Sequence, residues 1–136
     1  MSRTALIVGA GSGISASVAR ALAHDGYKVA LAARKTDKLK ALADETRAVL
    51  IEADATEAGQ VKAMFAKAEQ DLGPLDVVLY NASFRTRGPF VDLDPVDVAR
   101  TLHVSAYGVF WSGRKRRAAC WGAERASFCS PAPPPA

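Results

Sequence analysis

Short apolar runs alternate with longer helix-periodic segments over the first 110 residues of this 136-residue chain. The apolar runs have the length and composition of buried parallel strands and occupy residues 5–8, 28–33, 48–53 and 76–80. The segments that follow them carry apolar side chains at helical spacing and occupy residues 15–25, 38–46, 57–72 and 95–110. Strands that alternate with helices in this way predict an α/β fold, a doubly wound parallel sheet with helices on both faces.

Residues 111–136 lack this pattern. They contain a basic run at residues 114–117 and end in a proline-rich stretch at residues 130–136. We therefore predict two parts, a folded domain over residues 1–110 and an irregular, basic and proline-rich tail over residues 111–136.

The net charge of +4 comes entirely from that tail. Residues 1–110 contain 13 basic and 13 acidic side chains, whereas residues 111–136 contain 5 basic and 1 acidic side chain. The domain therefore has no basic excess with which to bind a phosphate backbone, and we expect no nucleic-acid partner.

The chain shows no sign of a membrane or metal partner. No apolar run approaches the roughly 18–20 residues of a membrane helix, and no signal peptide fits the N-terminus, so we expect a cytoplasmic protein. The two cysteines, Cys120 and Cys129, lie in the tail and lack the spacing of metal ligands.

A glycine-rich segment lies between the first predicted strand and the first predicted helix. Gly9, Ser12, Gly13 and Ile14 are the candidate ligand contacts in it, because glycines let a phosphate approach the backbone and a helix N-terminus attracts anions. The fingerprint G-x-G-x-x-G fails at Ile14, and the chain has no Gly-Lys-Ser/Thr of a P-loop. The alternative is a glycine-rich turn that binds nothing.

Four segments, in order, resemble the short-chain dehydrogenase/reductase family from residue 3 to residue 110. They are the glycine segment at 9–15, Asp-Ala-Thr at 54–56, Tyr-Asn-Ala-Ser at 80–83, and residues 104–110. The resemblance implies a Rossmann-like fold, here truncated after the fourth β-α unit. It also implies a nicotinamide dinucleotide as cofactor and hydride transfer to or from a small-molecule carbonyl or alcohol. A complete homologue is expected to be a homo-oligomer.

The end of the second predicted strand indicates which dinucleotide is preferred. An NAD enzyme carries an acid there to bind the ribose 2′-hydroxyl, but this chain has Arg34 and Lys35. Two cations suit a 2′-phosphate, and the Ser12 hydroxyl could add a hydrogen bond, so we predict NADP(H) over NAD(H). The alternative is that both cations are solvated surface residues.

The resemblance assigns further contacts at the next two strand ends. Asp54 and Ala55 should border the adenine, although Asp54 could equally be a helix N-cap or a loop anchor. Asn81 and Ala82 should lie beside the cofactor ribose, where ligands gather outside the carboxyl ends of parallel strands.

The family's catalytic groups are missing from this sequence. The family's helix-four asparagine corresponds to Ser105, which cannot present both an amide donor and a carbonyl acceptor. None of Tyr27, Tyr80 and Tyr107 is followed four residues later by lysine, so the Tyr-x-x-x-Lys motif is absent. We expect a catalytically incomplete fragment of an oxidoreductase. The alternative is a non-catalytic dinucleotide-binding or redox-sensing module.

The resemblance stops abruptly after Phe110, which suggests a change of reading frame. Back-translated with G/C-leaning third bases and read in another frame, residues 111–136 become a helix end, a glycine turn and an apolar strand ending in Thr-Gly-Ala. We hypothesise that the tail is out of frame; the alternative is a genuine, divergent C-terminus.

Overall fold

A computed structural model of the chain describes residues 2–121. Its centre is a four-stranded parallel sheet in the order β3-β2-β1-β4. The strands are β1 (Thr4–Val8), β2 (Lys28–Ala33), β3 (Val49–Glu52) and β4 (Val77–Tyr80). β1 is buried along its whole length, which explains why its sequence is apolar without alternation.

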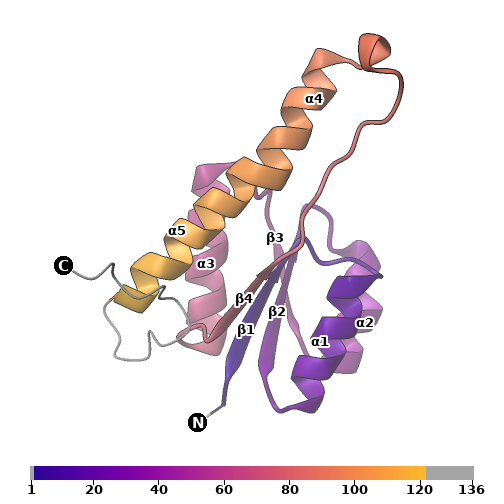
Figure 1. The fold of residues 1–136 in the computed structure, drawn as a ribbon. Coiled ribbons are helices and arrows are strands. Elements are labelled where there is room, and N and C mark those ends of the chain that lie inside the picture. Colours follow the sequence, from indigo (N-terminus) through magenta and orange to yellow (C-terminus); the bar gives the residue numbers. More distant parts are fainter. Residues whose placement is uncertain (1, 122–136) are drawn as a thin grey trace, which may run out of the picture.

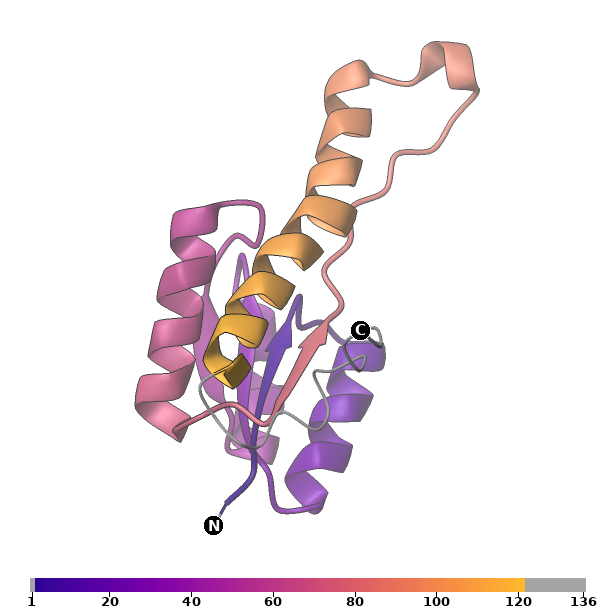
Figure 2. The same ribbon diagram turned by 60° about the vertical axis from the view of Figure 1, so that its left-hand side comes forward.

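Helices cover both faces of this sheet, as predicted (Figure 1). The helical elements are α1 (Ile14–His24), η1 (Asp37–Leu39), α2 (Lys40–Thr46), α3 (Ala58–Leu72), η2 (Phe90–Asp92), α4 (Pro95–Leu102), η3 (His103–Tyr107) and α5 (Gly108–Trp121). α1 and α2 lie on one face, and α3 and α5 lie on the other (Figures 1 and 2). The predicted α/β doubly wound architecture is confirmed.

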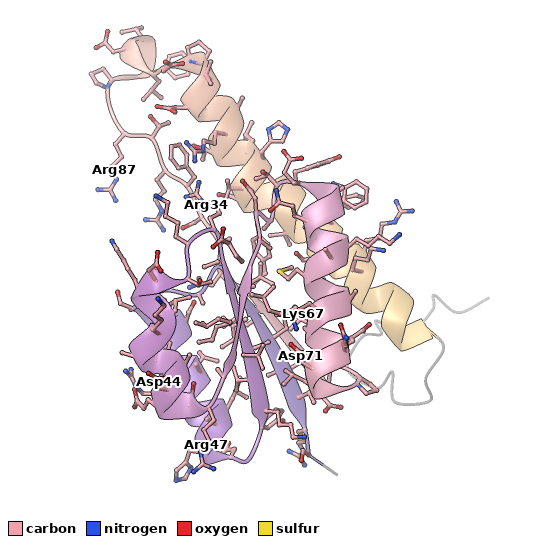
Figure 3. All side chains as sticks on the ribbon, turned by 180° about the vertical axis from the view of Figure 1, so that it is seen from behind. Arg34, Asp44, Arg47, Lys67, Asp71 and Arg87 are labelled. Carbon is pink, nitrogen blue, oxygen red and sulfur yellow. The ribbon has the colours of Figure 1, made fainter. Side chains whose placement is uncertain are left out.

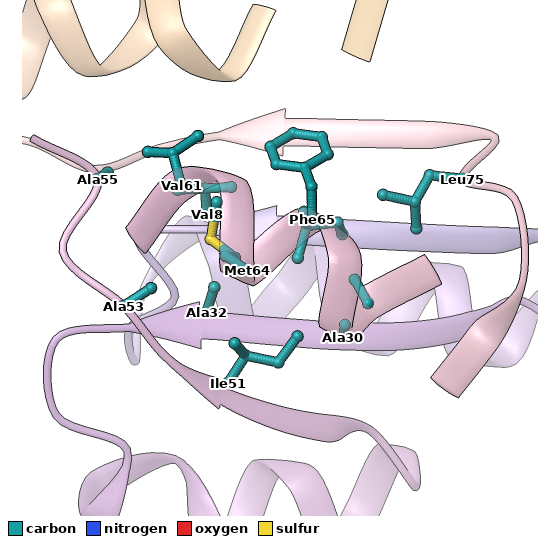
Figure 4. Packing of buried hydrophobic residues seen from close by; sticks show 12 residues of the cluster. Val8, Ala30, Ala32, Ile51, Ala53, Ala55, Val61, Met64, Phe65 and Leu75 are labelled. Atoms are coloured by element: carbon teal, nitrogen blue, oxygen red, sulfur yellow. The ribbon is translucent and has the colours of Figure 1, made fainter. Parts of the chain in front are cut away.

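Two apolar clusters, one on each face of the sheet, form the core. Alternate residues of β2 point to opposite faces: Ala30 and Ala32 join one cluster, while Val29 and Leu31 join the other. The small alanine side chains leave room for α3, whose large side chains, Met64 among them, fill that face of the sheet (Figure 4).

The helix after β4 is longer than the sequence pattern indicated. We expected irregular structure from residue 111, but α5 continues to Trp121. Residues 114–119 are arginine, lysine and alanine, all strong helix formers, and no proline interrupts them. This part of the helix shows no apolar periodicity, so a search for amphipathic spacing missed it. The proline-rich stretch and Cys129 lie outside the described residues.

The long helix is not uniform along its length. Asp94 is the N-cap of α4, and its Oδ1 accepts a hydrogen bond from the Val96 N–H at 2.7 Å, with Pro95 as the first residue of the helix. A π-helical segment, η3, then joins α4 to α5. Among the helices of the described region, none is long and apolar enough to cross a membrane.

Candidate functional site

A cavity of about 780 Å³ opens where the carboxyl ends of all four strands meet. Residues at or just beyond each strand end line it, starting from Val8, Ala33, Ala53 and Asn81. Seven of the predicted contact residues lie around this cavity: Gly9, Arg34, Lys35, Asp54, Ala55, Asn81 and Ala82. Parallel strands bring them together because their carboxyl ends share one edge of the sheet.

Gly9 holds the glycine loop against the end of β4. Its φ is +81°, and a Cβ built there would lie 2.7 Å from the Ala82 Cβ and closer still to the Ala82 backbone. The N–H groups of Gly9 and Ala10 donate to the Ala32 carbonyl at 2.9 and 3.0 Å. Glycine is therefore required at this position by both backbone conformation and space.

Ser15 connects the glycine loop to Asn81. The Asn81 Nδ2 donates to the Ser15 Oγ at 2.9 Å, and that hydroxyl donates to the Gly9 carbonyl at 3.2 Å. Ser15 is buried, and it directly follows the glycine-rich turn. We did not predict Ser15 as a site residue, although a hydroxyl at the first position of the predicted helix was the available signal.

Ser12, Gly13 and Ile14 lie beside the cavity rather than in its lining. They form the exposed approach to α1, and the Ile14 side chain is 71% exposed. Gly13 is the N-cap of α1 and supplies no side-chain hydrogen bond. The first N–H groups of the helix thus have no side-chain cap, which is the arrangement that favours an anion.

One part of the cavity wall is basic. Its charged lining residues are Arg34, Lys35 and Arg100 against Asp54, a net charge of +2. Arg100 comes from α4 and carries no sequence signal, so we did not predict it. Its guanidinium carbon lies 4.4 Å from the centroid of the Phe84 ring. Figure 3 shows Arg34 at the carboxyl end of the sheet, below α4.

Asp54 is a loop anchor, which was one of its two expected structural roles. Its Oδ1 accepts hydrogen bonds from the Thr56 N–H at 2.9 Å and from the Thr56 hydroxyl at 2.7 Å. Burial would raise the pKa of Asp54, but these bonds and the positive charges of Arg34 and Arg100 hold the pKa below its ordinary value. The carboxylate is therefore ionised and already partnered.

Tyr80 connects β4 to the π-helical segment. The Gly108 N–H donates to the His103 carbonyl, five residues back, and this releases the Val104 carbonyl from its usual helical partner. The Tyr80 hydroxyl donates to that carbonyl. Burial, and then the charge of Asp54, raise the pKa of Tyr80, so the phenol keeps the proton that it donates.

The structure does not bring Ser105 into the site. Ser105 is exposed in η3 and lines neither the 780 Å³ cavity nor a neighbouring one of about 350 Å³. His103 is exposed, lines the smaller cavity and places its Nδ1 3.0 Å from the Ala99 carbonyl. Within residues 2–121, no group of three or more histidine, cysteine, aspartate or glutamate side chains could hold a metal ion.

Comparison with known sequences identifies the family. A family sequence model described as short chain dehydrogenase matches residues 3–117. The chain belongs to the short chain dehydrogenase family. The match extends past Phe110, so the end that we assigned to the resemblance was too early.

Two relatives illustrate the extent of the similarity. Nodulation protein G of a Rhizobium species is 36% identical over 110 residues, covering 79% of this chain and 45% of the relative. Acetoacetyl-CoA reductase of Shinella zoogloeoides is 33% identical over 124 residues, covering 86% of this chain and 52% of the relative. The chain thus spans about half the length of these short chain dehydrogenases.

Solved structures of the family show the same fold. An actinorhodin polyketide ketoreductase with NADPH superposes with a TM-score of 0.85 at 28% identity, covering 92% of this chain and 50% of that one. A 3-ketoacyl-(acyl-carrier-protein) reductase from Brucella melitensis, complexed with NADH, has a TM-score of 0.77 at 27% identity, with 83% and 48% covered.

Proposed function

We propose that this domain binds NADP(H) and is the cofactor-binding half of an oxidoreductase that acts on a carbonyl or alcohol. The observation that carries the proposal is the 780 Å³ cavity at the carboxyl ends of the strands, with a glycine loop on one side and cations on another. Both features suit a phosphorylated dinucleotide. The bound nicotinamide would supply or accept the hydride.

Each part of the dinucleotide has a matching part of the site. The glycine loop and the uncapped start of α1 suit the pyrophosphate, and Gly9 leaves space that a side chain would fill. Asn81, held by Ser15, and Ala82 would lie beside a ribose. Asp54 and Ala55 would border the adenine.

The preference for NADP(H) rests on Arg34 and Lys35. Neither forms an ion pair among the described residues, so their charges are available to a 2′-phosphate. Asp54 is the one acid that lines the 780 Å³ cavity in the described region, and its carboxylate already accepts two hydrogen bonds from Thr56. The similar solved structures include one with NADPH and one with NADH, so similarity of fold does not indicate which cofactor this chain prefers.

Binding without turnover is the expected behaviour of the chain as written. The sequence contains no Tyr-x-x-x-Lys, and no described residue of the cavity replaces its general acid. A non-catalytic dinucleotide-binding or redox-sensing role is the second candidate, because the binding residues are present without catalytic ones. A cytoplasmic location, and a homo-oligomeric state for a complete homologue, stay predictions.

Two observations bear on the hypothesis of a change of reading frame after Phe110: the family match extends to residue 117 in the present frame, which counts against it, and two buried polar atoms directly after Phe110 count for it. The Trp111 Nε1 and the Ser112 Oγ are buried without a hydrogen-bond partner among the described residues. Our back-translation with G/C-leaning third bases places leucine and valine there, which would bury no polar atom. Sequencing the gene beyond the Phe110 codon tests this: an open second frame that reaches Tyr-x-x-x-Lys supports the frame change, and early stops in that frame contradict it.

Titration of the full chain with NADPH and NADH tests the binding proposal. We expect NADPH to bind more tightly, and Arg34→Gln to reduce this preference. Lys38→Gln is the matched control, because Lys38 is a nearby exposed cation that does not line the cavity. Failure of both nucleotides to bind a folded chain would refute the proposal.

A further inference from the structure

Arg100 and Arg34 come from distant parts of the chain but line the same two cavities. Both border the 780 Å³ cavity at the strand ends and the adjoining one of about 350 Å³. Asp54 is the other charged side chain that the two linings share within the described residues, and the smaller cavity adds the acid Glu57. The two guanidinium groups therefore stand on one rim, with the Asp54 carboxylate close to both.

The Asp54 carboxylate leaves both arginines available to a ligand. Its hydrogen bonds go to Thr56, and neither arginine is within ion-pair distance of a carboxylate in the described region. Their charges nevertheless act at this point, because both contribute to lowering the pKa of Asp54. An anion placed at the rim would meet two cations that no carboxylate pairs with in the described region, although Asp54 and, in the smaller cavity, Glu57 are nearby acids.

Arg100 is also held in a defined place. Its guanidinium carbon lies over the Phe84 ring, 4.4 Å from the centroid. A cation–π contact of this kind needs no N–H donor, so the donors of the guanidinium stay available to oxygen atoms of a ligand. Phe84 follows β4, so this contact ties α4 to the segment that borders the cavity.

We infer that Arg100 is a second specificity-determining residue, which together with Arg34 binds the 2′-phosphate of an NADP-type dinucleotide. This inference rests on the proposed function. It means that a residue of α4 helps the protein to discriminate between NADP(H) and NAD(H). A phosphomonoester dianion suits the rim because the charged lining of the larger cavity sums to +2. The 2′-phosphate is therefore bound by two arginines from different elements, Arg34 after β2 and Arg100 on α4.

Nucleotide binding by the full chain and three variants tests the assignment. The variants are Arg100→Gln, Arg100→Lys, which keeps the charge, and Arg87→Gln as the matched control. Arg87 lies on the segment before η2 and lines neither cavity (Figure 3). The probes are NADPH, NADH, adenosine 2′-monophosphate and adenosine 5′-monophosphate, each titrated against protein whose folding is checked by circular dichroism.

We expect Arg100→Gln to lower the preference for NADPH over NADH by about tenfold, and to weaken the 2′-monophosphate but not the 5′-monophosphate. Arg100→Lys should keep part of the preference, and Arg87→Gln should change it less than about twofold. Equal weakening of NADPH and NADH would overturn the inference, since it would place Arg100 at the base or the pyrophosphate.

The failure of this inference is distinguishable from failure of the proposed function. If the unaltered chain binds NADPH and Arg34→Gln weakens it, but Arg100→Gln does not, the assignment of Arg100 alone is overturned. If the folded, unaltered chain binds neither dinucleotide, both the proposed function and this inference are refuted.

Discussion

Replacing Gly9 with alanine tests the contact between the glycine loop and the end of β4. The added Cβ would lie 2.7 Å from the Ala82 Cβ and closer to the Ala82 backbone. Carbon atoms prefer separations of about 3.5–4.0 Å, so one of the two loops must move. The loop also has φ of +81° at this residue, a conformation that side-chain-bearing residues rarely adopt.

These effects can be converted into an expected loss of stability. Placing alanine in the left-handed region costs about 1–2 kcal/mol, and forcing extra atoms into a packed contact costs about 1–3 kcal/mol. Alanine recovers about 0.4–1 kcal/mol by restricting the unfolded chain. The net destabilisation is therefore about 1–5 kcal/mol, a sizeable share of the roughly 5–15 kcal/mol that stabilises a typical domain.

Urea unfolding followed by circular dichroism measures this loss. Gly11→Ala is the matched control, because it lies in the same loop and a Cβ there meets nothing within 4 Å. We expect Gly11→Ala to change the free energy of unfolding by less than about 0.5 kcal/mol. Equal effects of the two substitutions would refute the reasoning, since the contact with Ala82 would then carry no cost.

Three further predictions concern other parts of the structure. Tyr80→Phe should lower the free energy of unfolding, measured by thermal unfolding, by about 1–3 kcal/mol, because the Val104 carbonyl loses its donor. Tyr27→Phe, which removes an exposed hydroxyl, should lower it less. Equal losses would contradict the role assigned to the Tyr80 hydroxyl. The lowered pKa of Asp54 means that its ionised form stabilises the fold above about pH 4. That contribution falls as pH drops through the folded-state pKa, so the stability gap between the unaltered chain and Asp54→Asn should narrow in acid; a gap independent of pH would contradict this. Gly113→Ala should stabilise α5 by about 0.5–1 kcal/mol in urea unfolding, and no gain would argue against a helix beyond Phe110.

The pattern of the sequence was sufficient to locate the secondary structure. The runs that became β1 and β2 are apolar without alternation from Ala5 to Val8 and from Val29 to Ala33, because helices cover both faces of these strands. Gly26 and Gly73, with φ of +81° and +93°, come just after the ends of α1 and α3, where glycine is common. The pattern failed beyond Phe110, because a helix without an apolar face leaves no period to detect.

The sequence by itself also determined much of the candidate site. Gly9, Arg34, Asp54 and Asn81 each follow a predicted strand, and parallel strands bring such positions to one edge of the sheet. Local order along the chain was enough to predict that these residues lie together.

Only the tertiary structure decided which side chains act at that edge and what holds them. Asn81 donates to Ser15, Tyr80 donates to the Val104 carbonyl, and Arg100 lines the same cavities as Arg34, all across long separations in sequence. Such contacts depend on the helix packing and on the π-helical turn of η3, which set the direction of each side chain. No local pattern encodes a direction in space, so these residues became visible only in the folded chain.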